Sequence, residues 1–66
     1  MNVIVNGVPQ VTADGASLAG VLAGLGLSTH GVAVAVNEQV RPRASWPLVV
    51  LNEGDQVLII QPTQGG

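Results

Sequence analysis

The sequence predicts an α+β domain in which one main helix packs across a mixed sheet of four to five strands. Short runs rich in β-branched residues lie near both ends of the 66-residue chain, and one stretch with helical periodicity lies between them. Glycines and prolines separate these runs instead of forming a low-complexity tract. The expected order is therefore two strands, a helix, a strand, an optional strand and a last strand, in one domain covering residues 1–66.

The first two strands are expected to form a hairpin. Residues 1–5 and 8–12 are apolar runs, and Asn6 and Gly7 lie between them. Both of these residues tolerate the positive φ that a tight hairpin turn requires. Pro9 has no backbone donor, so the second strand is expected at an edge of the sheet.

A helix is expected to begin after Ser17, a favourable N-cap, and to end at Gly26, a favourable C-cap. Its apolar face has the spacing i, i+3, i+4, i+7 and consists of Leu18, Val21, Leu22 and Leu25. The opposite face carries no charge and consists of Ala19, Gly20, Ala23 and Gly24.

The middle of the chain predicts a strand and an irregular crossover. Residues 32–37 alternate bulky and small side chains, which suits a central strand that a helix covers on one side. A turn is expected near Glu38 and Gln39. Two prolines bracket residues 42–47, so this segment is expected to be irregular or 3₁₀-helical.

The last part of the chain predicts one further strand and a tail. Residues 48–51 are a short apolar run, and residues 52–55 are a turn that contains Gly54. Residues 56–61 are the expected last strand, and Pro62 ends it. Residues 62–66 are expected to be a flexible C-terminal tail.

Composition excludes several classes of function. The chain has no Cys, no Lys and one His, so it offers no disulfide, thiolate metal site, P-loop or Schiff-base lysine, and no bound metal or cofactor is expected. Two arginines and a net charge of −2 do not support nucleic-acid binding. The longest apolar stretch, 18–27, is shorter than the about 20 residues that span a bilayer. Since no basic residue precedes Arg41, a signal peptide is not expected, and the predicted location is the cytoplasm.

The side chains give no internal argument for an enzyme. Gly15, Ser17 and Ala19 fall one glycine short of a nucleophile elbow, so Ser17 is interpreted as a helix cap. His30 is interpreted as a solvated loop residue and Trp46 as a core or edge anchor. No pair of carboxylates has a reason to converge.

The chain end does suggest a chemistry. Gly65 and Gly66 are its last residues. A terminus without Cβ atoms can thread a narrow active site and present its α-carboxylate there. That carboxylate is ionised at pH 7 and inert as an electrophile, but conversion to an acyl-adenylate gives it a leaving group that a sulfur nucleophile can displace.

These features resemble the ThiS family, the sulfur carrier of thiamine biosynthesis, which has the β-grasp or ubiquitin-like fold. The resemblance spans the whole chain and rests on three stretches: residues 32–37 followed by Val40-x-x-Arg43-x-x-Trp46, Leu51-x-x-Gly54-Asp55-x-Val57, and the terminal Gly65-Gly66.

The resemblance implies a cycle in which this chain is a co-substrate of other enzymes. A ThiF-type adenylating enzyme uses MgATP to adenylate Gly66, and sulfur from a cysteine desulfurase converts Gly66 to a thiocarboxylate. A ThiG-type thiazole synthase then accepts the sulfur. Gly65 and Gly66 give access to the partner active sites. We expect the uncharged back of the helix and the apolar last strand to provide the docking surface.

Other functions share the same features. The small subunit of molybdopterin synthase and sulfur carriers for cysteine or other metabolites have the same fold and terminal thiocarboxylate. A ubiquitin-like modifier would form isopeptide bonds through Gly66. An interaction domain with an incidental glycine pair is the remaining alternative.

Overall fold

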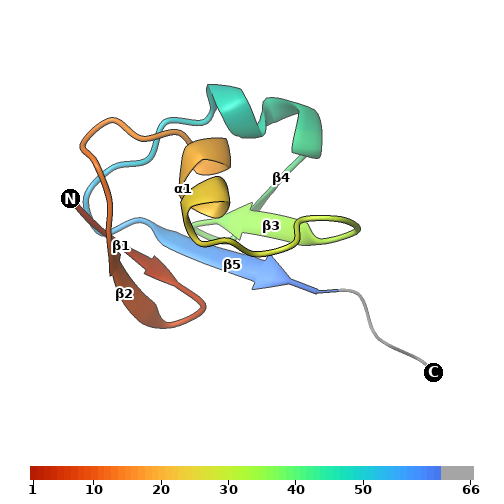
Figure 1. The fold of residues 1–66 in the computed structure, drawn as a ribbon, viewed down its shortest axis with the longest axis horizontal. Coiled ribbons are helices and arrows are strands. Elements are labelled where there is room, and N and C mark those ends of the chain that lie inside the picture. The colour runs from red at the N-terminus through yellow and green to blue at the C-terminus, as the bar shows by residue number, and fades with distance from the viewer. Residues whose placement is uncertain (62–66) are drawn as a thin grey trace.

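The computed structural model describes residues 1–61, and these residues form a five-stranded mixed sheet with one α-helix and one 3₁₀ helix (Figure 1). The strands lie in the order β2-β1-β5-β3-β4. The elements are β1 Asn2–Val5, β2 Val8–Val11, α1 Leu18–Gly24, β3 Ala33–Val36, β4 Gln39–Arg41, the 3₁₀ helix η1 Arg43–Leu48 and β5 Gln56–Ile60. The predicted tail, 62–66, lies outside the described residues.

The predicted hairpin is confirmed. β1 pairs antiparallel with β2, and Val5 lies opposite Val8. Asn6 and Gly7 form the turn with φ values of 50° and 81°. β2 is an edge strand, as the missing donor of Pro9 predicts.

The predicted helix and its N-cap are also confirmed, whereas the C-cap is Leu25, one residue before the predicted Gly26. The Ser17 hydroxyl accepts a hydrogen bond from the backbone N–H of Gly20 at 3.0 Å. Gly26 follows the helix with a φ of 69°, a conformation that favours glycine. Three residues of the predicted apolar face are buried and the fourth packs against the core at its margin: Leu18, Val21, Leu22 and Leu25.

The turn between β3 and β4 lies one residue earlier than the sequence predicts. Asn37 and Glu38 form it, with φ values of 49° and 70°, whereas Gln39 already belongs to β4. Glu is an unusual residue at positive φ, so its identity gave no turn signal. Asn37 tolerates this conformation, and its side-chain oxygen also accepts a hydrogen bond from the Gln56 N–H at 3.0 Å.

The fifth strand, which the sequence left optional, is β4. The apolar run 48–51 forms no strand: within it, Val50 makes an isolated bridge with Ser17. The Val49 carbonyl accepts from the Leu18 N–H at 2.8 Å, so this run closes over the start of α1. η1 occupies the segment where the sequence predicts an irregular or 3₁₀ crossover.

β5 is the middle strand of the sheet, and β3 lies beside it. β5 runs parallel to β1 and antiparallel to β3. α1 and η1 cover one face of this sheet (Figure 1). Trp46 is buried between them, and its indole N–H donates to the Arg41 carbonyl at 2.9 Å, which confirms its role as an anchor. The core consists of Val3, Val5, Leu18, Val21, Leu22, Val34, Val36, Trp46, Leu51, Val57 and Ile59.

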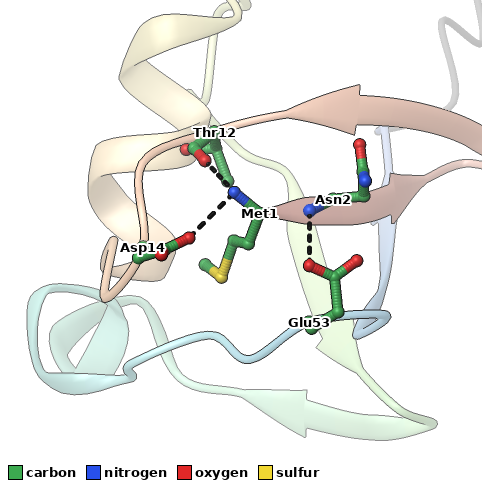
Figure 2. Close-up of polar contacts among 5 residues, drawn as sticks. All are labelled: Met1, Asn2, Thr12, Asp14 and Glu53. Carbon is green, nitrogen blue, oxygen red and sulfur yellow. Dashed lines mark hydrogen bonds and ion pairs between the residues drawn. The ribbon is translucent and has the colours of Figure 1, made fainter.

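Polar contacts fix the start of β1 (Figure 2). The terminal ammonium of Met1 donates to the Thr12 carbonyl at 2.6 Å and lies 2.9 Å from the Asp14 carboxylate. The Asn2 N–H donates to Glu53 at 3.0 Å. The hairpin is thereby tied both to the segment before α1 and to the turn before β5.

Within residues 1–61, no helix has the length and apolar character needed to cross a membrane. The same residues contain no group of three or more His, Asp or Glu side chains placed to hold a metal ion.

Candidate functional site

The predicted modification site, Gly66, and its neighbour Gly65 lie outside the described residues. The structure does define the strand that leads to them. β5 ends at Ile60, and Gln61 is the last residue described. Five residues separate Gln61 from the chain end, and a fully extended chain of that length spans about 17 Å. A partner that acts on Gly66 must therefore bring its surface close to the end of β5.

The face of the sheet away from α1 is open and apolar next to this strand. Ala35 lies opposite Leu58 on β5 and opposite Val40 on β4. Directly opposed residues point to the same side of a sheet, so these three form one row across it. Leu58 and Val40 are 51% and 69% exposed, whereas Ala35 between them is covered but does not belong to the core cluster. We call the side chains Ile4, Ala35, Val40, Leu58 and Ile60 the open sheet face.

The open sheet face contains a hollow of about 280 Å³. Ile4, Ala35 and Leu58 line its apolar part. Gln56 and Glu38 are among its polar lining residues, and Glu38 is the charged one. Exposed aliphatic groups around a hollow with little charge are typical of a protein interaction surface. The apolar last strand that the sequence favours for docking thus presents every second side chain to this face.

On the uncharged back of α1, Gly20, Ala23 and Gly24 are exposed, whereas Ala19 is half-buried against the core, and this face borders a different feature. A second hollow of about 280 Å³ lies between α1 and η1. Ala23, Leu27, Thr29 and Arg43 are among its lining residues. This hollow combines small apolar groups with a guanidinium, and it lies on the opposite side of the sheet from the open sheet face.

A loop before β3 borders the end of β5. We call residues 27–32 the exit loop. Ala33, the next residue, pairs with Ile60, so the exit loop ends beside the point where the chain leaves the sheet (Figure 1). His30 lies exposed in this loop, where the sequence places a solvated residue.

The carboxylate of the resemblance motif, Asp55, has structural partners. Asp55 accepts hydrogen bonds from the Asn37 side chain at 3.0 Å and from the Asn52 N–H at 2.7 Å. These bonds join the β3–β4 turn to the turn before β5. Ser17 serves as a helix cap. Each of these side chains therefore supports the fold.

Comparison with known proteins shows to which family the chain belongs. The model of the ThiS family matches residues 3–66, which is nearly the whole sequence. The chain belongs to the ThiS family. Its fold is the β-grasp fold predicted from the sequence, and the predicted function, a sulfur carrier in thiamine biosynthesis, is confirmed.

Curated relatives agree with this membership. The sulfur carrier protein ThiS of Escherichia coli is 32% identical over 66 residues, which covers all of both chains. A thiazole synthase of Magnetococcus marinus is 38% identical over the same 66 residues. The present chain spans 20% of the length of that thiazole synthase.

Solved structures agree as well. One is the crystal structure of the thiamine biosynthesis protein ThiS of Geobacter metallireducens, which superimposes on the present structure with a TM-score of 0.86. The two sequences are 28% identical, and the match covers the full length of both chains. A solution structure of a thiamine biosynthesis protein from the same organism gives a TM-score of 0.79. It matches all of the present chain and 88% of that chain, also at 28% identity.

Proposed function

We propose that the α-carboxylate of Gly66 is the group that carries sulfur. One carboxylate oxygen attacks the α-phosphorus of ATP in a ThiF-type adenylating enzyme, and pyrophosphate leaves. A persulfide sulfur, supplied from cysteine by a desulfurase, then attacks the acyl carbon and displaces AMP. Cleavage of the sulfur–sulfur bond by a thiol leaves the thiocarboxylate on Gly66.

The observation that carries this proposal is the extent of the family match, which continues through Gly66. β5 delivers the chain end from the middle of the sheet, so the five residues beyond Gln61 start from a fixed point. Two glycines without Cβ atoms keep the last part of the tail thin enough for an enclosed active site. MgATP belongs to the adenylating partner, and the present chain contributes the carboxylate.

The thiocarboxylate then gives its sulfur to a ThiG-type thiazole synthase. The thiazole synthase of Magnetococcus marinus supports this partner, because about a fifth of its length resembles the whole of the present chain. When a carrier-like segment and a thiazole synthase belong to one chain, each meets the other at a high effective concentration. We infer that two separate chains achieve the same encounter through a docking surface.

The open sheet face is the docking surface that we propose for the adenylating enzyme. It flanks the strand that leads to the tail, and Leu58 and Ile60 on that strand are 51% and 49% exposed. Burial of such groups provides about 25 cal/mol for each Å² of apolar surface. The tail can extend at most about 17 Å. The surface around the active site of the adenylating enzyme must therefore lie close to the open sheet face when Gly66 reacts.

Intact mass spectrometry tests the chemistry. After incubation with MgATP, a ThiF-type enzyme, cysteine and a desulfurase, the chain should gain the mass difference between sulfur and oxygen, localised to Gly66. A chain that lacks Gly66 should fold and remain unmodified. Modification of the shortened chain, or an unmodified full chain with enzymes active on another carrier, would refute the proposal.

A substitution on the open sheet face tests docking. Leu58→Asp should raise the KM of the carrier for the adenylating enzyme and leave the circular dichroism spectrum unchanged. Leu48→Asp is the matched control, because Leu48 is 80% exposed on η1, on the other side of the sheet. Equal KM values for the two variants would show that docking does not use this face.

A further inference from the structure

We propose that Arg43 is a positioning residue for delivery of the C-terminal glycine, because it fixes the exit loop against η1 beside the base of the tail. This inference rests on the proposed function, and it assigns a role to a residue that takes no part in the chemistry. It also identifies the exit loop as a second surface that the adenylating enzyme contacts.

Arg43 connects η1, the helix on which it lies together with Trp46, to the exit loop. Its Nη1 donates to the backbone carbonyl of Thr29 at 2.9 Å, and its Nη2 lies 3.4 Å from the Thr29 hydroxyl. Its guanidinium carbon lies 5.5 Å from the centre of the Trp46 ring. A planar guanidinium can bond two acceptors and stack on a ring at the same time, which an ammonium group cannot do.

The anchor of this contact is rigid. Trp46 is 5% exposed in the core between α1 and η1, and its indole N–H is bonded to the Arg41 carbonyl. Arg43 itself is exposed, so its removal leaves no cavity in the core. Because the guanidinium contacts both the fixed Trp46 ring and the Thr29 carbonyl, it restrains the position of the exit loop.

The Thr29 carbonyl that Arg43 contacts belongs to the turn that precedes β3. It also accepts the Val32 N–H at 3.5 Å, so residues 29–32 form a closed turn. Ala33 follows this turn and pairs with Ile60, after which only Gln61 precedes the tail. Arg43 therefore stabilises the turn that ends next to the base of the tail.

The partner must contact this region because the tail is short. A reach of about 17 Å from Gln61 brings the rim of an enclosed active site against the residues that surround the end of β5. These include the open sheet face, the exit loop that ends beside Ile60, and the β1–β2 turn, where the Asn6 side chain accepts from the Ile59 N–H at 2.7 Å. A loop held in one conformation loses less conformational entropy on docking than a mobile one.

Steady-state kinetics of pyrophosphate release by a ThiF-type adenylating enzyme tests the inference, with the carrier as the varied substrate. Arg43→Ala should raise KM about tenfold and change kcat by less than about twofold, because the bound complex reacts normally once it has formed. Arg43→Lys should recover only part of the affinity, since it restores the charge but not the paired bonds to Thr29.

Arg41→Ala is the control for charge, although Arg41 is half-buried whereas Arg43 is exposed. It removes the same charge from β4, where Arg41 bonds to Gln39 and not to the exit loop, and it should leave KM unchanged. An equal rise in KM for Arg41→Ala and Arg43→Ala would show that the loss of one positive charge explains the effect, and it would overturn the inference. So would an unchanged KM for Arg43→Ala, or a loss confined to kcat.

Hydrogen exchange of the free carrier tests, without any enzyme, whether Arg43 holds the exit loop in one conformation. Arg43→Ala should speed exchange of the Val32 amide at least about tenfold while amides of β5 keep their protection. Unchanged exchange at Val32 would overturn the inference even if the carrier works. A wild-type carrier that supports no pyrophosphate release would instead refute the proposed function, and the role of Arg43 in delivery with it.

Discussion

Replacing Asp55 with alanine removes the carboxylate that joins two turns of the domain. One oxygen accepts from the Asn37 side chain at 3.0 Å, and the other accepts from the Asn52 N–H at 2.7 Å. Asn37 in turn accepts from the Gln56 N–H, the first residue of β5. The substitution therefore weakens the support of both the β3–β4 turn and the start of the central strand.

The expected cost is about 2 kcal/mol. A hydrogen bond to a charged group contributes about 1.5–3 kcal/mol, and partial exposure of this site reduces each of the two bonds to about 1 kcal/mol. For a domain of this size, 1 kcal/mol lowers Tm by about 4–8 °C. We thus expect a decrease of about 10 °C for Asp55→Ala and about half of that for Asp55→Asn, which keeps one acceptor oxygen.

Thermal unfolding followed by circular dichroism measures this effect, and Asp14→Ala is the matched control. Asp14 has the same charge, but its side chain is 91% exposed and pairs with the terminal ammonium. The Met1 side chain is 6% exposed, but solvent around the Asp14 carboxylate screens the pair, which contributes about 1 kcal/mol or less. A Tm decrease for Asp55→Ala no larger than that for Asp14→Ala would refute the assignment of a structural role to the Asp55 bonds.

Four further substitutions test the fold by chemical denaturation. Leu22→Ala should cost about 3 kcal/mol, because Leu22 is 1% exposed, whereas Val11→Ala at an 85% exposed position should change stability by less than about 0.5 kcal/mol. Gly54→Val should cost about 1–2 kcal/mol because φ is 81° there, although no atom lies within 4 Å of the added Cβ. An unchanged denaturation midpoint would show that this turn does not need glycine. Gly24→Ala should instead add about 0.5 kcal/mol, since its Cβ meets open space in a helix, and a loss of stability would contradict that geometry.

Local chemistry explains which elements could be predicted from the sequence. The hairpin depends on the neighbours Asn6 and Gly7, and the start of the helix depends on Ser17 within the same few residues. The position of the β3–β4 turn could not be predicted, because Glu38 adopts a positive φ that its side chain does not favour. The Asn37 side chain helps to fix this turn from β5, a contact that spans 19 residues.

Long-range pairing and the surroundings of the tail depend on contacts that no local pattern encodes. β1 and β5 pair in parallel although Ile4 and Gln56 lie far apart in the sequence, and neither this pairing nor the order of the strands within the sheet was predicted. The bond between Arg43 and the Thr29 carbonyl was missed for the same reason. The spacing of Arg43 and Trp46 was the available signal, since i, i+3 positions of a 3₁₀ turn lie one above the other.

The central position of β5 determines how the fold responds to mechanical load. A pull on the C-terminal end of β5 acts along the axis of a strand that is hydrogen-bonded on both sides, to β1 and to β3. Interstrand hydrogen bonds lie across that axis, so the pull shears many bonds at once instead of opening them one by one from an edge. The sheet is therefore arranged to resist a pull on the C-terminal end of β5 without opening from an edge.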